Sequence, residues 1–316
     1  ALTNTLSKGD KVLSARFGQF SHLWIEMCKK LHIDVEVVDV EWGSGTPHDE
    51  FERILSEDSN HEIKAVLVTH NETSTGVTND VKATRDLLNK LNHPALLFVD
   101  GVSSIGSIKF EMDSWGVDVA VSGSQKGFML PAGLAISCVS QKALEIAKSA
   151  NLPRAYFDYH DMLKINETGY WPYTNPMPLL RGLREALIMM NEEGLDNIYS
   201  RHLFLAQAVQ KASEAWGLNL CAKDPSLYSN TVTAIMVPEG IDSTDIVKTA
   251  YNKYNTSFGG GLNKVAGKLF RIGHLGDLNS TMILGAISTA ELAMYDVGIK
   301  FELGSGVAAA IKHLKV

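Results

Sequence analysis

The first 140 residues alternate short apolar runs with amphipathic segments, and this alternation constrains the fold more than any other feature of the chain. The apolar runs are rich in β-branched residues and read KVLSARF, IDVEVVDV, IKAVLVTH, ALLFVDG, VDVAVSG and LAISCVS. Segments with helical periodicity lie between them, at residues 20–31, 47–58 and 78–91. Strands that alternate with helices form βαβ units, and near-continuous apolar strands are buried on both faces. The pattern therefore predicts an α/β fold with a mostly parallel central sheet sandwiched by helices.

The remainder of the chain divides into an irregular segment, a helical stretch and a second α/β unit. Residues 151–175 are aromatic and polar without a clear period, and a loop of this length in a compact protein is usually functional. Residues 176–217 are largely helical. A strand (TVTAIMVP), a helix (242–254), a strand (KLFRIGHLG) and a helix (280–296) follow. We therefore expect a large domain at 1–194 and a smaller C-terminal α/β domain at 195–316.

Composition argues against several classes of function. The chain has 316 residues, of which 45% are hydrophobic, and this is enough for a sizeable core. Its 36 acidic and 29 basic residues give a net charge of −7 without a basic run, which argues against nucleic acid or an anionic membrane as a partner. No apolar run approaches the roughly 18 residues of a membrane span. Cys28, Cys138 and Cys221 lie far apart without a pairing pattern, which suits a reducing compartment, and we expect no metal ion.

Polar side chains follow three apolar strands at their carboxyl ends. Thr73 comes after VLVTHNE, Asp100 after ALLFV, and Gln125 and Lys126 after VAVSGS. Ligands of open parallel sheets bind beyond the carboxyl ends of the strands, so we expect a carboxylate and an amine to face one cleft. A lysine at the mouth of a buried strand is costly unless it is paired or neutral. Taken singly, Asp100 also fits an N-cap, and Lys126 also fits a surface residue.

The motifs around these residues resemble one protein family. VDGVSSIG followed by SGSQKGFMLPAG is similar to the class V (fold type I) pyridoxal-phosphate aminotransferases. The resemblance continues through THNETSTGV, YWPYTNPMPLLRGLREAL and GLNKVAGKLFRIGHLG, and it covers essentially the whole chain. It implies a pyridoxal 5′-phosphate cofactor and a homodimer with shared active sites. It also implies transfer of an amino group from L-serine to glyoxylate, with alanine or ureidoglycine as alternative donors.

The resemblance gives each candidate residue a role. Lys126 would form the Schiff base with the cofactor and move a proton at the substrate's α-carbon, and Asp100 would keep the pyridine nitrogen protonated. Arg271 in LFRIGHLG would bind the substrate carboxylate through its planar fork. The remaining cofactor contacts would be Thr73 to the phenolic oxygen, Gln125 to the phosphate, Phe17 and Val102 to the two ring faces, and Thr174 to the phosphate of the neighbouring subunit.

Other interpretations stay open. From the residues alone, Phe17 also fits a core phenylalanine, Thr73 a turn-capping hydroxyl, and Arg271 a structural ion pair. His274 fits a structural histidine. A cysteine desulfurase shares the lysine and the fold but needs a reactive loop cysteine, which the three cysteines do not obviously provide. A non-catalytic, dimer-forming remnant is the other alternative.

The resemblance also implies segments that the printed sequence does not contain. The family's glycine-rich phosphate cup and its N-terminal arm would lie upstream of ALTNTLSKGD. We therefore expect weak cofactor binding by the 316 residues alone. Photorespiratory relatives are peroxisomal, whereas the last residues, AAAIKHLKV, carry no SKL-like tripeptide. The expected location is the peroxisome by resemblance, or the cytosol if the targeting signal is truly missing.

Overall fold

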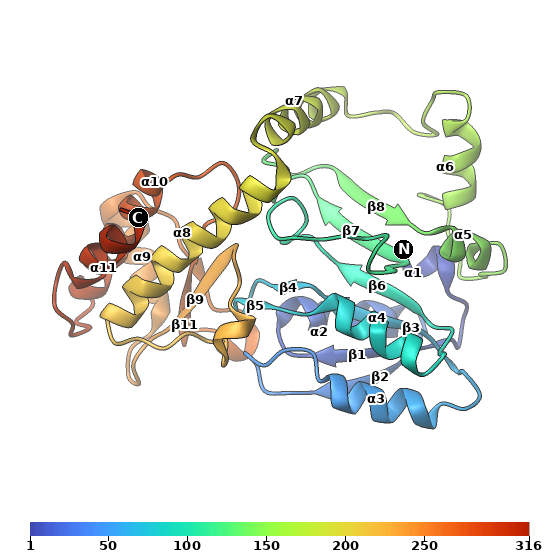
Figure 1. The fold of residues 1–316 in the computed structure, drawn as a ribbon, viewed down its shortest axis with the longest axis horizontal. Coiled ribbons are helices and arrows are strands. Elements are labelled where there is room, and N and C mark those ends of the chain that lie inside the picture. Colours follow the sequence, from blue (N-terminus) through green and yellow to red (C-terminus); the bar gives the residue numbers. More distant parts are fainter. Residues whose placement is uncertain (316) are drawn as a thin grey trace.

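A six-stranded sheet forms the centre of the first half of the chain in the computed structural model, which describes residues 1–315 (Figure 1). The strand order is β2-β1-β3-β6-β7-β8; the first five strands are parallel, and β8 is antiparallel to β7. The strands are β1 (Lys11–Arg16), β2 (Asp34–Asp39), β3 (Ile63–Thr69), β6 (Leu96–Asp100), β7 (Val119–Gly123) and β8 (Ala135–Val139). The predicted mostly parallel sheet is confirmed.

Successive residues of the central strands enter two separate hydrophobic cores, one on each face of the sheet. In β3, Val66 packs with helices α3 (His48–Glu57) and α4 (Val81–Lys90). Its neighbour Leu67 packs with α1 (Leu2–Thr5), α2 (Gln19–Lys30) and α5 (Gln141–Ala147). The near-continuous apolar runs follow from this burial on both faces, and the predicted helical layers are confirmed.

Helix α4 begins later than the predicted segment 78–91, because the preceding residues form a hairpin. Strand β5 (Val77–Thr78) pairs with β4 (Asn71–Glu72), and the helix then starts after Asp80, whose carboxylate accepts a hydrogen bond from the Ala83 N–H at 2.9 Å. Thr73 lies in this hairpin, whereas β3 ends at Thr69. The prediction that Thr73 ends a strand of the main sheet is therefore wrong.

A three-stranded antiparallel sheet forms the C-terminal unit, in the order β10-β11-β9. Its strands are β9 (Val232–Met236), β10 (Gly259–Gly260) and β11 (Leu269–Gly273). Helices α8 (Leu195–Ala215), α9 (Ser243–Tyr254), α10 (Ser280–Asp296) and α11 (Ser305–Leu314) share one hydrophobic core with it. The predicted strands and helices are present, and β10 and α11 are additional.

Helix α7 (Met177–Glu193) leads into α8 through Gly194, whose φ of 82° interrupts the helical path (Figure 1). The hydrophobic core of the C-terminal unit begins beyond this point. We propose Gly194 as the boundary, with domains at 1–194 and 195–316. Within residues 1–315, no helix has both the length and the apolar character that crossing a membrane requires.

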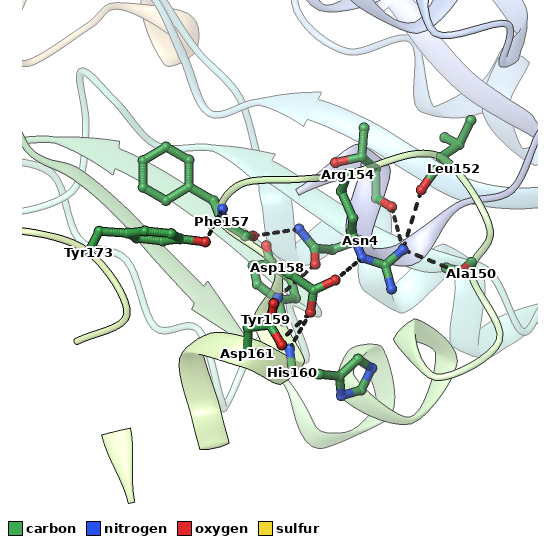
Figure 2. Close-up of polar contacts among 11 residues, drawn as sticks. Asn4, Ala150, Leu152, Arg154, Phe157, Asp158, Tyr159, His160, Asp161 and Tyr173 are labelled. Atoms are coloured by element: carbon green, nitrogen blue, oxygen red, sulfur yellow. Dashed lines mark hydrogen bonds and ion pairs between the residues drawn. The ribbon is translucent and has the colours of Figure 1, made fainter. Parts of the chain in front are cut away.

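The segment 151–175, predicted to be irregular, contains helix α6 (Tyr159–Asn166) and is fastened to the start of the chain (Figure 2). The buried Asn4 side chain donates from Nδ2 to the Phe157 carbonyl at 3.0 Å and accepts from the Tyr159 N–H at 2.8 Å. The Phe157 N–H also donates to the Tyr173 hydroxyl at 2.8 Å. One asparagine therefore links the first helix to the loop that ends beside Thr174.

Arg154 and Asp158 complete this attachment. The Arg154 guanidinium donates to the Thr3 carbonyl at 3.1 Å and pairs with the Asp158 carboxylate at 2.5 Å (Figure 2). Asp158 also accepts from the His160 N–H at 2.8 Å and so caps α6. The short helix forms where this cap and the long-range contacts coincide.

Replacing Asn4 tests the attachment. We expect Asn4→Ala to lower the free energy of unfolding by about 2 kcal/mol, because the buried Tyr159 N–H loses its acceptor. Asn151→Ala is the matched control, since its side chain accepts only an exposed bond from the Lys8 N–H, and we expect about 0.5 kcal/mol or less. Urea unfolding measures both. Equal losses in the two variants would contradict the assigned role of Asn4.

Candidate active site

The carboxyl ends of β6 and β7 lie side by side and hold two of the predicted groups. The strands pair in parallel with Asp100 opposite Val121, and the Gly101 N–H donates to the Val121 carbonyl at 2.9 Å. Lys126 follows in the turn after β7. The two side chains are close enough for each to shift the pKa of the other. The carboxylate and the amine are therefore near neighbours at the ends of adjacent strands, and the expectation that they face one cleft stays a prediction.

Burial controls the ionisation of Asp100. Burial raises the pKa of its carboxyl group to about 6, and the charge of Glu72 acts in the same direction. The hydrogen bond from the Val102 N–H to Oδ1, at 3.0 Å, and the charge of Lys126 lower the pKa. A carboxyl group in this range ionises readily when a further cation approaches.

Lys126 has the surroundings of a nucleophilic amine. Burial lowers the pKa of Lys126, and the charge of Arg271 lowers it further, whereas Asp100 raises it. A lowered pKa leaves a larger fraction of the amine neutral, and only the neutral form attacks a carbonyl carbon. The lowered pKa therefore explains how a lysine can lie at the end of a buried strand.

Small polar residues before Lys126 shape its turn. The Ser124 hydroxyl is buried; it donates to the Pro131 carbonyl at 2.8 Å and accepts from the Leu134 N–H at 3.1 Å. A Cβ atom on Gly123 would lie 2.7 Å from Oε1 of Gln125, so a larger residue would displace the Gln125 side chain. Gln125 itself is exposed, and its contact with a phosphate stays a prediction.

Arg271 belongs to the C-terminal unit and lies close enough to Lys126 for its charge to lower the pKa of that amine. Its Nε donates to the Gly260 carbonyl at 3.0 Å, and its Nη1 donates to the Thr73 carbonyl at 3.1 Å. Burial lowers the pKa of the guanidinium, and the charge of Glu72 raises it. No carboxylate of the described residues is hydrogen-bonded to Arg271, which argues against the structural ion pair. The bonds to Gly260 and Thr73 leave the guanidinium oriented, with further N–H groups free.

The hydrogen bonds of Ser103 determine where the hydroxyl hydrogen of Thr73 points. Ser103 Oγ donates its single hydrogen to the Asn71 carbonyl at 2.9 Å and accepts from Asn71 Nδ2 at 2.9 Å. The remaining contact, 2.8 Å from Thr73 Oγ1 to Ser103 Oγ, therefore needs the Thr73 hydrogen. In this arrangement the Thr73 hydroxyl can only accept from a further partner, and its contact with the phenolic oxygen of a cofactor stays a prediction. The sequence analysis did not single out Asn71 and Ser103. The one feature of the sequence that pointed to them is that they lie within the motifs THNETSTGV and VDGVSSIG.

Glu72 is a second group that the sequence did not single out. Its fully buried carboxylate accepts from the N–H groups of Phe20 and Ser21 at the start of α2, at 3.0 and 2.9 Å. A helix N-terminus stabilises such a negative charge. A Cβ atom on Gly18 would lie 2.2 Å from the Glu72 side chain, so this position requires glycine. These contacts hold the hairpin that contains Thr73 against the end of β1.

The other predicted cofactor residues occupy different settings. Phe17 is 2% exposed and packs in the core beneath α3 and α4, where a structural role also fits. Val102 is half-buried beside Asp100, to which its N–H donates. Thr174 is exposed in the connection between α6 and α7. The contacts of these three residues with a cofactor stay predictions.

Several groups are unsuited to chemistry at the site. Burial raises the pKa of Cys28 to about 12 and of Cys221 to about 11, and it also raises the pKa of Cys138. Reactive thiols need a lowered pKa, so a desulfurase is disfavoured. Burial lowers the pKa of His274 to about 3, and its ring bonds to Asn230 and Thr233. Within residues 1–315, no group of three or more potential ligand side chains could hold a metal ion.

The donor set fits one kind of cofactor. An amine with a lowered pKa at Lys126 suits an aldehyde, and a buried carboxylate at Asp100 suits a basic ring nitrogen that must stay protonated. The oriented guanidinium of Arg271 suits a substrate carboxylate. These are the requirements of amino-group transfer through pyridoxal 5′-phosphate.

Comparisons with known proteins agree with this chemistry. The family model Aminotransferase class-V matches residues 1–261. A serine–glyoxylate aminotransferase of Hyphomicrobium methylovorum is 59% identical over 315 residues, which is 99% of this chain and 78% of that protein. An L-aspartate–glyoxylate aminotransferase of Paracoccus denitrificans is 55% identical over 319 residues, covering 100% of this chain and 80% of its own length.

A solved structure shows the same fold. Pyridoxamine–pyruvate aminotransferase from Mesorhizobium loti is similar with a TM-score of 0.91 at 28% identity, over 99% of this chain and 80% of that one. The family model and the close relatives both extend over most of the chain. The chain therefore belongs to the class V aminotransferases and is a pyridoxal-phosphate-dependent transaminase.

Proposed function

We propose that this enzyme transfers the amino group of L-serine to glyoxylate, giving hydroxypyruvate and glycine. The observation that supports the proposal is that Asp100 and Arg271 both lie close enough to Lys126 to shift its pKa, in a chain 59% identical to a serine–glyoxylate aminotransferase. Both substrates are small carboxylates, so the site needs one carboxylate anchor and room for a short polar side chain. L-Aspartate is a second candidate donor, because the Paracoccus relative is named for it.

The roles of the residues follow from their surroundings. Pyridoxal 5′-phosphate, when bound, supplies an aldehyde carbon that takes up the amino group and a ring that withdraws electrons. Lys126, whose pKa is lowered, would bind that carbon through its amine, and its Nζ would move the proton to and from the substrate's α-carbon. Asp100 would keep the ring nitrogen protonated. Arg271 binds the substrate carboxylate with the N–H groups that Gly260 and Thr73 leave free.

The assembly and the location belong to the same proposal. A homodimer with shared active sites, in which Thr174 reaches the neighbouring phosphate, is supported by the exposure of Thr174 and of apolar side chains on α7, namely Met177, Leu187, Ile188 and Met189. The location, peroxisomal or cytosolic, rests on the family resemblance. Light scattering and a fluorescent fusion would measure the two properties directly.

A screen of amino donors tests the proposed substrate. With glyoxylate as acceptor, we expect the highest kcat/KM for L-serine, followed by alanine and L-aspartate. Discrimination by one small side-chain group is modest, roughly 10- to 200-fold. A higher kcat/KM for another donor would overturn the choice of serine while leaving the transaminase intact. If none of the donors is turned over at saturating cofactor, the result would instead favour the non-catalytic remnant.

The raised pKa of Asp100 lets us predict how cofactor binding depends on pH. Its pKa, raised from 3.8 to about 6, means that the carboxylate is present above about pH 6 and takes up a proton below it. Its attraction for the protonated ring nitrogen is therefore complete above that pH and is lost as the pH falls. We expect cofactor affinity to weaken up to about tenfold per pH unit below pH 6 through this group.

Asp100→Asn separates this effect from titration of the phosphate, whose second pKa is also near 6. The variant should bind the cofactor more weakly than the wild type above pH 6, and the two affinities should converge below it. Fluorescence titration between about pH 5 and pH 8 measures both curves. A constant ratio of the two affinities across this range would contradict the role of Asp100.

A further inference from the structure

Gly259 lies directly beside the guanidinium of Arg271. Strand β10 pairs with β11 so that Gly259 stands opposite Arg271 and Gly260 opposite Phe270. A Cβ atom on Gly259 would lie 3.1 Å from Nε, 3.2 Å from Cζ and 3.2 Å from Nη2 of Arg271. These distances are shorter than ordinary van der Waals contact, so any side chain here would press on the guanidinium.

The guanidinium has little freedom to move aside. Its Nε–H bonds to the Gly260 carbonyl and one Nη1–H bonds to the Thr73 carbonyl, so it is held from both the C-terminal unit and the β4–β5 hairpin. Bonds donated by a charged group are the stronger ones and depend on geometry. Three of the five N–H groups remain, one on Nη1 and two on Nη2. The three nearly equal distances place a Cβ atom on Gly259 over the face of the guanidinium, where it would push the group away from its two carbonyl acceptors.

We propose that Gly259 is a positioning residue for substrate binding: its missing side chain lets Arg271 keep the orientation in which its remaining N–H groups bind the carboxylate of a short amino or oxo acid. The proposal rests on the proposed role of Arg271 as the carboxylate anchor. The φ of Gly259 lies outside the left-handed region, so an alanine could adopt the same backbone. The requirement for glycine is therefore a matter of space beside Arg271.

Another glycine of the C-terminal unit offers a control. Gly285 lies exposed in α10, and its φ also lies outside the left-handed region. A Cβ atom there would meet nothing within 4 Å. Gly285→Ala therefore makes the same chemical change in the same unit, at a residue that makes no contact with Arg271.

Kinetics and binding of the two alanine variants test the proposal. We expect Gly259→Ala to raise the KM for serine and for glyoxylate about tenfold, and to weaken competitive inhibition by propionate to the same extent. The kcat should change less than about twofold, and the cofactor dissociation constant should stay unchanged, because only carboxylate binding is affected. Gly285→Ala should leave all four quantities unchanged. Equal effects in the two variants, or none in Gly259→Ala, would overturn the proposal.

A double-mutant cycle separates the proposal from the function on which it rests. A lysine at position 271 has no planar guanidinium for a side chain at position 259 to displace. Adding Gly259→Ala to Arg271→Lys should therefore not change the KM or the inhibition by propionate any further. A further change would overturn the role of Gly259. If Arg271→Lys alone leaves propionate inhibition unchanged, the carboxylate anchor itself is wrong. If Gly259→Ala does not fold, the double variant with Arg271→Lys must fold. A double variant that also does not fold would overturn the proposal.

Discussion

Two oppositely charged side chains, Asp100 and Lys126, lie at the ends of neighbouring parallel strands, and the site depends on the cost of burying them. Burial raises the pKa of the acid to about 6 and lowers the pKa of the amine, so each group is moved towards its neutral form. Their mutual attraction opposes this effect. The balance leaves an amine that can react as a nucleophile and a carboxyl group that ionises when a ring cation arrives.

The surrounding structure keeps this pair accessible and adds a fixed cation. Arg271 is held between the Gly260 carbonyl of the C-terminal unit and the Thr73 carbonyl of the hairpin, and its charge lowers the pKa of Lys126 further. The hairpin is in turn held by Glu72 at the N-terminus of α2. The proposed carboxylate recognition and the lowered pKa of the amine therefore depend on one connected arrangement.

The sequence was sufficient for features that depend on local pattern. Parallel strands buried on both faces give apolar runs, and polar residues at their ends marked Asp100 and Lys126 before any geometry was known. Features that depend on distant contacts were not predictable. Helix α6 is tied to Asn4, which is 153 residues away from Phe157, and β10 is a pair of glycines that only its partner strand orders. Glu72 and Ser103 likewise gain their roles from contacts alone.

The pKa of Lys126 in the cofactor-free protein tests the central claim most directly. It can be measured by NMR of the ¹³C-methylated lysine or from the pH dependence of its acylation. The account predicts a pKa below 10.5, which falls further in Asp100→Asn and rises in Arg271→Met, because those variants remove one raising and one lowering charge. A pKa at or above 10.5 that neither substitution changes would contradict it.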